Sequence, residues 1–412
     1  MNNFKNNQLI PSIMVELLAP VSDRIMLKAA IDAGADAVYF GLKKLNMRAT
    51  GKNFTLEELP EIVKQCHDNK VRVFLTVNSI VYNEELAEIK KIVKGAKGAG
   101  VDAIICWDMA VIQECKKQNI EFHISTQASV SNIESAQFYK DLGATRVVLA
   151  RELNLNQITE IIEKTDIEVE TFIHGAMCVS VSGRCFTSQY LFNKSANRGD
   201  CLQPCRREYR IIDISEKDKE LVLGENYIMS PKDLCALPFL DKLIKAGIVC
   251  FKIEGRVRSP EYVKTVTAVY REAIDAVEKG IFNEELIKKL TEKLKTVYNR
   301  GFSTGFYLGS PTNDDFTDKH GSKALTKKVY VGFVKNFLKK IMVAEVKVES
   351  DNLRIGDKIM IQGPTTGVQE QILDSMQINH KPINEAEKTA VGIKLNFIAR
   401  ENDKVFVIKP LD

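Results

Sequence analysis

Short apolar runs alternate with amphipathic helical stretches from residue 13 to about residue 280. The apolar runs are rich in β-branched residues and lack polar alternation, which is typical of parallel strands buried under helices. Eight such units in about 250 residues match the size of a TIM barrel. We therefore predict an α/β fold built on a TIM-like (β/α)8 barrel. The predicted strands are Met14–Leu18, Ala37–Gly41, Val71–Asn78, Ala103–Cys106, Glu121–Ser125, Arg146–Ala150, Glu168–Ile173 and Val249–Ile253.

One joint between helix and strand recurs along this region. It appears as AGADAVYFG from Ala33, AGVDAIIC from Ala99, LGATRVVLA from Leu142 and AGIVCFKIEG from Ala246. In each copy a glycine would end a helix in the left-handed conformation, and a strand follows. The recurrence indicates a repeated β/α unit. A doubly wound sheet stays open as an alternative, because the repeat does not show that the sheet closes.

The spacing of the strands divides the chain into parts. About 75 residues separate the seventh and eighth strands, and the excess forms a cysteine-rich insertion at 175–230. An insertion after a barrel strand emerges on the catalytic face. We assign 1–280 to the barrel and 281–325 to a helical and loop connector. Short strands with turn signals such as Gly356-Asp357 predict a small all-β barrel at 326–412.

The composition is that of an ordinary globular protein with a mildly basic balance. The 412 residues include 58 Lys and Arg against 54 Asp and Glu, a net charge of +4. This balance permits an RNA partner, but any basic surface must be a local patch. The start lacks the pattern of a signal peptide, and no apolar stretch reaches the length of a membrane span. These features predict a cytoplasmic protein with no membrane partner.

Four of the nine cysteines lie within 28 residues, at Cys178, Cys185, Cys201 and Cys205. Their spacing, C-x6-C-x15-C-x3-C, differs from the paired C-x2-C knuckles of common zinc ribbons. In a chain without an export signal, such a group indicates a metal more often than disulfides. Four thiolates on loop positions suit an iron–sulfur cluster. Four buried structural cysteines are the alternative.

Polar residues follow or lie in every predicted strand, where burial is costly unless they face a site. Lys252, Arg256 and Arg258 form a cationic group suited to carboxylates or phosphates. Salt bridges around the barrel top would explain single residues equally well, and His174 could also be a core histidine or a cluster ligand. The candidate catalytic residues are Glu16, Arg151, His174, Lys252, Glu254 and Arg256.

The run ETFIHGAMCVSVSGRCFTS resembles the signature of the collagenase-like (U-thirty-two) peptidase family. Thr187 departs from the signature, which has an aliphatic residue there. The resemblance extends through ELLAP, HISTQASVSN, NRGDCLQPCRREY and FKIEGRVRSPEYV, and covers residues 14–270. The matching positions are Glu170, Phe172, Gly175, Ala176, Met177, Cys178, Gly183, Cys185 and Ser188.

Better understood members of this family are hydroxylation proteins for RNA bases or ubiquinone precursors. The resemblance implies a 4Fe-4S cluster on Cys178, Cys185, Cys201 and Cys205. It also implies an RNA hydroxylase whose partners are tRNA or rRNA and a small anionic cosubstrate, for which prephenate is implicated, with a homologous partner subunit left open. Glu16 or His174 would move protons, while Arg151, Lys252 and Arg256 would position the anion.

The length and the small C-terminal β-barrel are closest to the branch that makes 5-hydroxyuridine at the tRNA wobble position. Two segments, LNMRATGKNFTLEEL and FLTVNSIVYNEEL, also resemble the longer branch that hydroxylates a cytidine in 23S rRNA. A peptidase, or a non-catalytic RNA-binding factor with structural zinc, would also be compatible with the family resemblance and the cysteines. The sequence has neither G-x-S-x-G nor HExxH, the motifs of two common peptidase chemistries.

Overall fold

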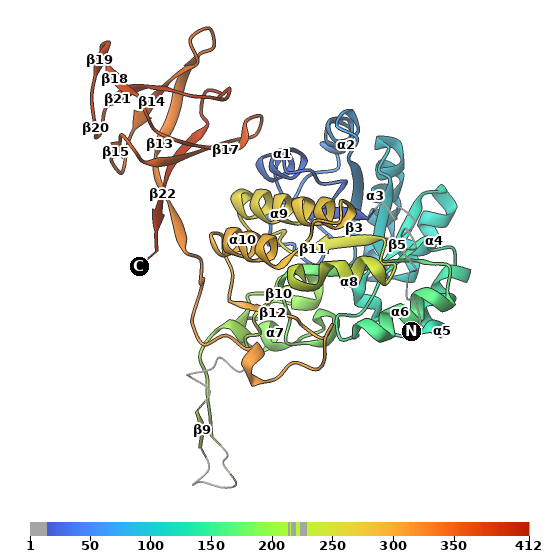
Figure 1. The fold of residues 1–412 in the computed structure, drawn as a ribbon. Coiled ribbons are helices and arrows are strands. Elements are labelled where there is room, and N and C mark those ends of the chain that lie inside the picture. The colour runs from blue at the N-terminus through green and yellow to red at the C-terminus, as the bar shows by residue number, and fades with distance from the viewer. Residues whose placement is uncertain (1–14, 213–214, 216–219, 223–228, 412) are drawn as a thin grey trace, which may run out of the picture.

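A computed structural model describes residues 15–212, 215, 220–222 and 229–411 of the chain (Figure 1). Eight parallel strands form a closed barrel, because β11 pairs with β1 on one side and with β7 on the other. The predicted TIM-like barrel is confirmed, and closure excludes a doubly wound sheet. The barrel strands are β1 (Glu16–Pro20), β2 (Ala37–Gly41), β3 (Arg72–Val77), β4 (Ala103–Cys106), β5 (Glu121–Ile124), β6 (Arg146–Val148), β7 (Glu168–Ala176) and β11 (Cys250–Ile253).

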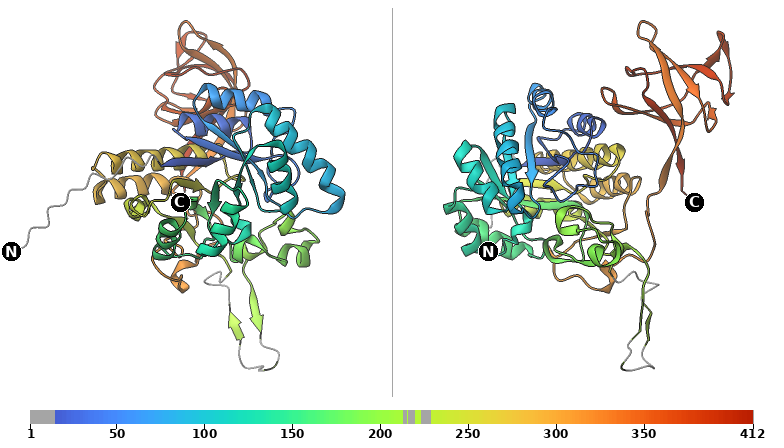
Figure 2. Two further views of the ribbon diagram at one scale, coloured as in Figure 1. Left: turned by 90° about the vertical axis from the view of Figure 1, so that its right-hand side faces the viewer. Right: turned by 180° about the vertical axis from the view of Figure 1, so that it is seen from behind.

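Helices surround the barrel and follow the strands in turn (Figures 1 and 2). Among the described residues, no helix combines the length and the apolar character needed to cross a bilayer. The covering helices are α1 (Arg24–Asp32), α2 (Leu59–Asp68), α3 (Leu86–Ala99), α4 (Met109–Gln118), α5 (Ile133–Asp141), α6 (Leu155–Lys164), α8 (Leu240–Lys245) and α9 (Pro260–Glu278).

The recurring helix-to-strand joint has the predicted geometry. Gly34, Gly100, Gly143 and Gly247 all have positive φ, between +81° and +102°. Gly100 is the C-cap of α3, and its N–H donates to the carbonyls of Ala96 and Lys97. Only glycine adopts this conformation without a steric cost, so the repeated glycine fixes where each helix stops and the next strand begins.

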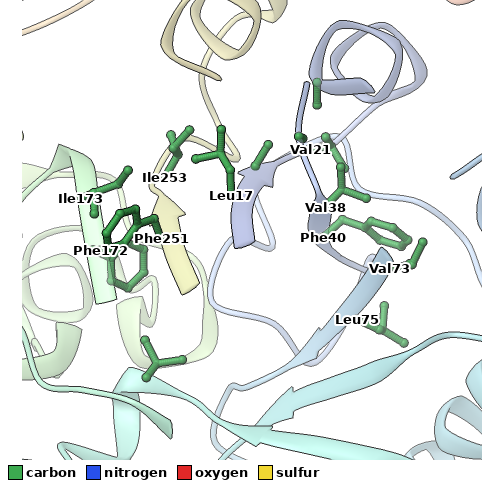
Figure 3. Packing of buried hydrophobic residues seen from close by; sticks show 14 of the residues in the cluster. Leu17, Val21, Val38, Phe40, Val73, Leu75, Phe172, Ile173, Phe251 and Ile253 are labelled. Atoms are coloured by element: carbon green, nitrogen blue, oxygen red, sulfur yellow. The ribbon is translucent and has the colours of Figure 1, made fainter. Parts of the chain in front are cut away.

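Side chains alternate between two cores along the barrel strands. The larger core lies between strands and helices, and Figure 3 shows part of it, including Leu17, Phe40 and Leu75. The neighbouring positions Leu18 and Tyr39 belong to a separate, smaller cluster. This alternation is the period of a strand whose two faces are both buried.

Two further strands extend the barrel sheet, one from the insertion between β7 and β11 and one from the connector after the barrel. Strand β10 (Asp233–Cys235) pairs antiparallel with β7, and β12 (Phe302–Ser303) pairs with β10. The predicted connector thus contains a strand as well as helix α10 (Glu284–Lys295). Strands β8 (Arg210–Ile212) and β9 (Glu220–Val222) form a hairpin that projects away from the barrel (Figures 1 and 2).

The C-terminal part is an eight-stranded antiparallel sheet, in agreement with the predicted all-β character. It packs on α1 through Ala29, Met360, Val368 and Phe406. Its strands are β13 (Thr326–Leu338), β14 (Val343–Val348), β16 (Lys358–Gly363), β17 (Gly367–Ile372), β18 (Met376–Ile378), β19 (Lys381–Pro382), β21 (Ala390–Lys394) and β22 (Lys404–Pro410), with β15 (Leu353–Arg354) and β20 (Glu385–Ala386) paired beside it.

Two glycines near the end of α3 provide a matched test of the joint. Gly100 has φ +81°, so Gly100→Ala should lower the free energy of unfolding by about 1–2 kcal/mol. Gly98 is inside the helix, and a Cβ added there would have nothing within 4 Å, so Gly98→Ala should raise it by about 0.5–1 kcal/mol. Denaturant unfolding of both variants measures the two effects. Equal effects would show that the left-handed cap does not control this joint.

Candidate functional site

Four of the predicted site residues converge at the barrel mouth. Arg151, Lys252, Glu254 and Arg256 line one pocket of about 50 Å³. They come from the carboxyl ends of β6 and β11 or from the loops after them, which is where TIM-barrel enzymes bind substrates. The pocket is therefore a site assembled by the barrel rather than a set of scattered surface charges.

Two guanidinium groups in this pocket lack a carboxylate partner. Arg256 is 4% exposed and donates to the side-chain oxygens of Asn46 (3.1 Å) and Thr76 (2.8 Å). Arg151 donates to the Ala176 carbonyl at 2.8 Å, and its guanidinium lies 3.8 Å from the centroid of Phe172. Within the described ranges neither arginine forms an ion pair with a carboxylate. Burial lowers the pKa of Arg256 to about 10, so the group stays charged at neutral pH.

The other two charges of the pocket are paired. Lys252 donates to Glu170 at 2.7 Å, and its ammonium lies 4.3 Å from the Tyr39 ring centroid. Glu254 accepts from Arg48 (Nε at 3.1 Å). Burial acts to raise the pKa of Glu254, but Arg48 and Arg151 outweigh it and hold that pKa at about 2. The pocket therefore keeps an excess of positive charge and suits an anion.

The prediction that Glu16 lies at the mouth is wrong. Strand β1 starts at Glu16, so this residue lies at the amino end of the barrel, opposite the pocket. Its carboxylate accepts hydrogen bonds from Arg146 (2.5 Å) and Arg72 (3.3 Å). These two arginines are the first residues of β6 and β3, at the same end of the barrel. The predicted strand began two residues earlier, at Met14, which lies outside the described residues. That offset moved Glu16 toward the wrong end.

The side chain of His174 does not reach the pocket either. The β7–β11 register shifts between the pairs Lys252–Phe172 and Ile253–His174. The His174 ring packs against Tyr270 and Phe302, and its Nδ1 lies 3.2 Å from the Tyr270 hydroxyl. Burial, with Arg258 nearby, lowers the pKa of His174 to about 3. His174 is a neutral packing residue, and the prediction that it moves protons at the mouth is wrong.

All four clustered cysteines line a second, larger cavity of about 370 Å³. It shares Met47, Arg48, Thr126, Gln127 and Arg151 with the basic pocket, so the two spaces adjoin at the barrel mouth. The other cysteines, including Cys235 in β10, are buried elsewhere. The insertion thus places its thiols directly above the barrel mouth.

Close packing holds the insertion in this position. A Cβ on Gly199 would lie 2.3 Å from the Asn46 carbonyl, so the chain around Cys201 lies flat on the loop after β2. Arg206 donates to the Pro231 carbonyl (2.8 Å) and the Ser230 hydroxyl (2.9 Å). Arg198 binds Glu85 in the loop before α3. These contacts leave little freedom for the loops that carry the thiols.

The donor set fits a metal cluster by its chemistry. Burial raises the pKa of Cys205, and the three other clustered thiols add to the rise while Arg206 opposes it. Such mutual repulsion requires a cationic group to hold four thiolates together. Among the described residues, no group of three His, Cys, Asp or Glu side chains is close enough together to bind a single metal ion. The four thiols surround a cavity of about 370 Å³, which is large enough for a group bigger than a single ion.

The site also includes residues that the sequence analysis did not single out. Tyr39 and Thr76 line the basic pocket from the interior faces of β2 and β3. The Tyr39 hydroxyl donates to the Ile253 carbonyl at 2.8 Å. A polar residue within an otherwise apolar strand was the available signal. At the rim, the Asn78 side-chain amide donates a hydrogen bond of 3.2 Å to the Gln127 side-chain oxygen.

The sequence matches the model of a known protein family. The family model for peptidase family U32 matches residues 23–317, which include the barrel after its first strand, the insertion and most of the connector. The chain belongs to this family.

Individual relatives carry differing names. A protein named as an uncharacterized protease from Methanocaldococcus jannaschii is 46% identical over 406 residues, covering 96% of this chain and 99% of that protein. A collagenase from Porphyromonas gingivalis is 42% identical, covering 95% and 97%. The tRNA hydroxylation protein P1 of Bacillus subtilis is 37% identical, covering 85% and 83%. The relatives thus include both a peptidase name and an RNA-modification name.

The burial of His174 has a consequence for stability. Its pKa is about 3 in the folded state and ordinarily about 6.5, so below pH 6.5 the unfolded chain binds a proton that the folded chain does not. The free energy of unfolding should therefore fall by about 2 kcal/mol between pH 7 and pH 5 because of this group. Denaturant unfolding of His174→Asn at both pH values should show a fall smaller by that amount. An unchanged pH dependence would contradict the buried, neutral state of His174.

Proposed function

We propose that this protein is an iron–sulfur-dependent RNA hydroxylase, and that its substrate is the wobble uridine of tRNA, converted to 5-hydroxyuridine. One observation carries the proposal: four cysteines line a cavity that adjoins a basic pocket at the mouth of a TIM barrel. The relative named as a tRNA hydroxylation protein supports the choice of RNA substrate.

Cys178, Cys185, Cys201 and Cys205 would hold a 4Fe-4S cluster. Soft thiolates are the ligands such clusters require. When bound, the cluster supplies one-electron transfer or Lewis-acid chemistry next to the substrate. Burial acts to raise the pKa of the Cys185 thiol, but hydrogen bonds with the Thr187 hydroxyl (2.9 Å), the Thr187 N–H (3.4 Å) and the Ser180 side chain outweigh burial and lower that pKa.

Arg151 and Arg256 would bind the anionic cosubstrate, for which a carboxylate such as prephenate is our candidate. Both guanidiniums are held in place by neutral oxygens, so their charge is available to a ligand. A carboxylate in this pocket would supply the pairing that buried guanidiniums otherwise lack. Lys252 and Tyr39 would border the ligand, while Glu254 keeps Arg48 oriented.

A peptidase is the second candidate, since the relative from Porphyromonas gingivalis is named a collagenase. The thiols at the mouth would then be the nucleophile candidates. A cysteine nucleophile needs a general base within about 3.2 Å. The nearest candidate by sequence, His174, faces Tyr270 instead. His174 is therefore not placed to act as the base of a cysteine peptidase. Cleavage of collagen by anaerobically purified protein, lost in Cys178→Ser, would favour the peptidase.

Replacement of single cysteines tests the ligand set. Cys178→Ser or Cys205→Ser should lose most of the iron and the brown colour, because a hydroxyl is a poor ligand for a soft metal. Cys235→Ser is the matched control, since Cys235 is buried in β10 away from the cavity. Iron analysis and visible absorption of anaerobically purified proteins provide the measurement. Loss of iron in Cys235→Ser with full iron in Cys205→Ser would refute the assignment.

Nucleoside mass spectrometry of tRNA and rRNA from a strain lacking the gene tests the reaction. We expect 5-hydroxyuridine to be absent from tRNA and restored by the wild-type gene. Arg256→Met should retain its iron, since it leaves the cysteines untouched, but should restore little modification, since it removes a guanidinium from the anion pocket. Loss of a hydroxylated cytidine from rRNA instead would identify rRNA as the substrate. If the modified nucleosides of both RNAs are the same in the deletion strain as in the wild type, the proposal is contradicted.

A further inference from the structure

Two aromatic rings stand almost free in solvent beside the cysteine cavity. Phe186 is 77% exposed and Tyr190 is 88% exposed. Tyr190 is the most exposed of the large hydrophobic side chains in the described part of the chain. Side chains of this size usually bury most of their surface, and exposed ones that gather together indicate an interaction site.

The two rings are arranged as a pair. Phe186 is the N-cap of helix α7 (Thr187–Phe192), and the Tyr190 N–H donates to the Phe186 carbonyl at 2.8 Å. Residues four positions apart on a helical turn are neighbours on its surface. The same turn lines the cysteine cavity with Thr187 and Ser188. The rings therefore flank the cavity on the element that forms its wall.

The segment that carries the rings is rich in basic residues. Residues 178–210 contain six Lys or Arg and two Asp or Glu, a net charge of +4, which equals the net charge of the whole chain. Arg207 is exposed and lies 5.0 Å from the centroid of Phe192, at the end of the same helix. Lys194 is exposed just after it. Aromatic rings set among exposed cations are the combination that binds single-stranded nucleic acid.

We infer that Phe186 and Tyr190 form a stacking platform for unpaired RNA bases that flank the nucleotide held in the cavity. This inference rests on the proposed function and specifies how the RNA is held. Arg207 and Lys194 contact the phosphates next to the stacked bases. Every base has a π-face, so the platform selects single-stranded RNA over duplex without reading its sequence.

The test is the affinity for a fluorescein-labelled single-stranded RNA of roughly ten nucleotides, which is within the site size of such platforms. Each lost stack should weaken binding about 5- to 150-fold, in Phe186→Ala and in Tyr190→Leu. Tyr190→Phe keeps the ring and should bind like wild type. Phe138→Ala removes another exposed ring, 58% exposed on α5, and should also bind like wild type.

Salt dependence separates stacking from phosphate contact. Arg207→Gln should reduce the slope of log affinity against log salt by about 0.7, the value for one phosphate contact on a single strand. Phe186→Ala should weaken binding with the slope unchanged. Equal RNA affinity in wild type and in the Phe186→Ala/Tyr190→Leu double variant overturns the platform. A change from dimer to monomer in the double variant, with RNA affinity unchanged, overturns it in favour of an interface between two copies.

Complementation of the deletion strain keeps the two proposals apart. Restoration of the modified nucleoside by wild type but only weakly by the double variant supports both. Equal restoration by both proteins, together with equal affinities, overturns the platform and leaves the hydroxylase standing. Failure of the wild-type gene to restore any nucleoside overturns the hydroxylase, and the oligonucleotide affinities then decide the platform alone.

Discussion

A chain of buried charges runs through the barrel and fixes the floor of the site. Lys252 at the mouth binds Glu170 at 2.7 Å, Glu170 lies 3.5 Å from Arg146, and Arg146 binds Glu16 at the amino end. Burial acts to raise the pKa of Glu170, but Lys252 and Arg146 outweigh it and lower that pKa. Removal of one partner from a buried pair typically costs about 3–5 kcal/mol, because the other charge is left unpaired. The position of Lys252 therefore depends on residues at the far end of the barrel.

This dependence gives a structural meaning to the family signature. Its first two positions, Glu170 and Phe172, face the barrel interior, where Glu170 holds Lys252 and Phe172 lies under the Arg151 guanidinium. Its next glycine, Gly175, has φ +107°, and a Cβ there would lie 2.5 Å from the Glu254 carbonyl. Only after this close contact does the chain leave the barrel toward Cys178. The signature thus couples the anion pocket, the strand exit and the first thiol along nine residues of sequence.

The sequence predicted the barrel well because its strands are buried on both faces and read as continuous apolar runs. The glycine joints added their boundaries. Among the predicted site residues, some were placed correctly and others were not. Arg151, Lys252, Glu254 and Arg256 follow clear strand ends, and the structure brings them together. The prediction for Glu16 was wrong because a shift of two residues at the start of a strand moves a side chain along the barrel axis. His174 failed because the register irregularity beside it has no signal in the sequence. The exposure of Phe186 and Tyr190 could not be predicted from the sequence either, because it depends on how the insertion packs.

The barrel mouth is also where stability and binding oppose each other. Arg256 is almost fully buried, and its hydrogen-bond partners within the described part of the chain are neutral, which leaves its charge poorly compensated in a region of low dielectric. Glu254 is near enough to lower this cost but is itself bound to Arg48. A protein under selection for stability alone would replace Arg256 with an apolar residue or pair it directly. The retained charge is explained if an anionic ligand completes the pair. Binding that ligand then stabilises the fold and positions the substrate beneath the cysteine cavity at the same time.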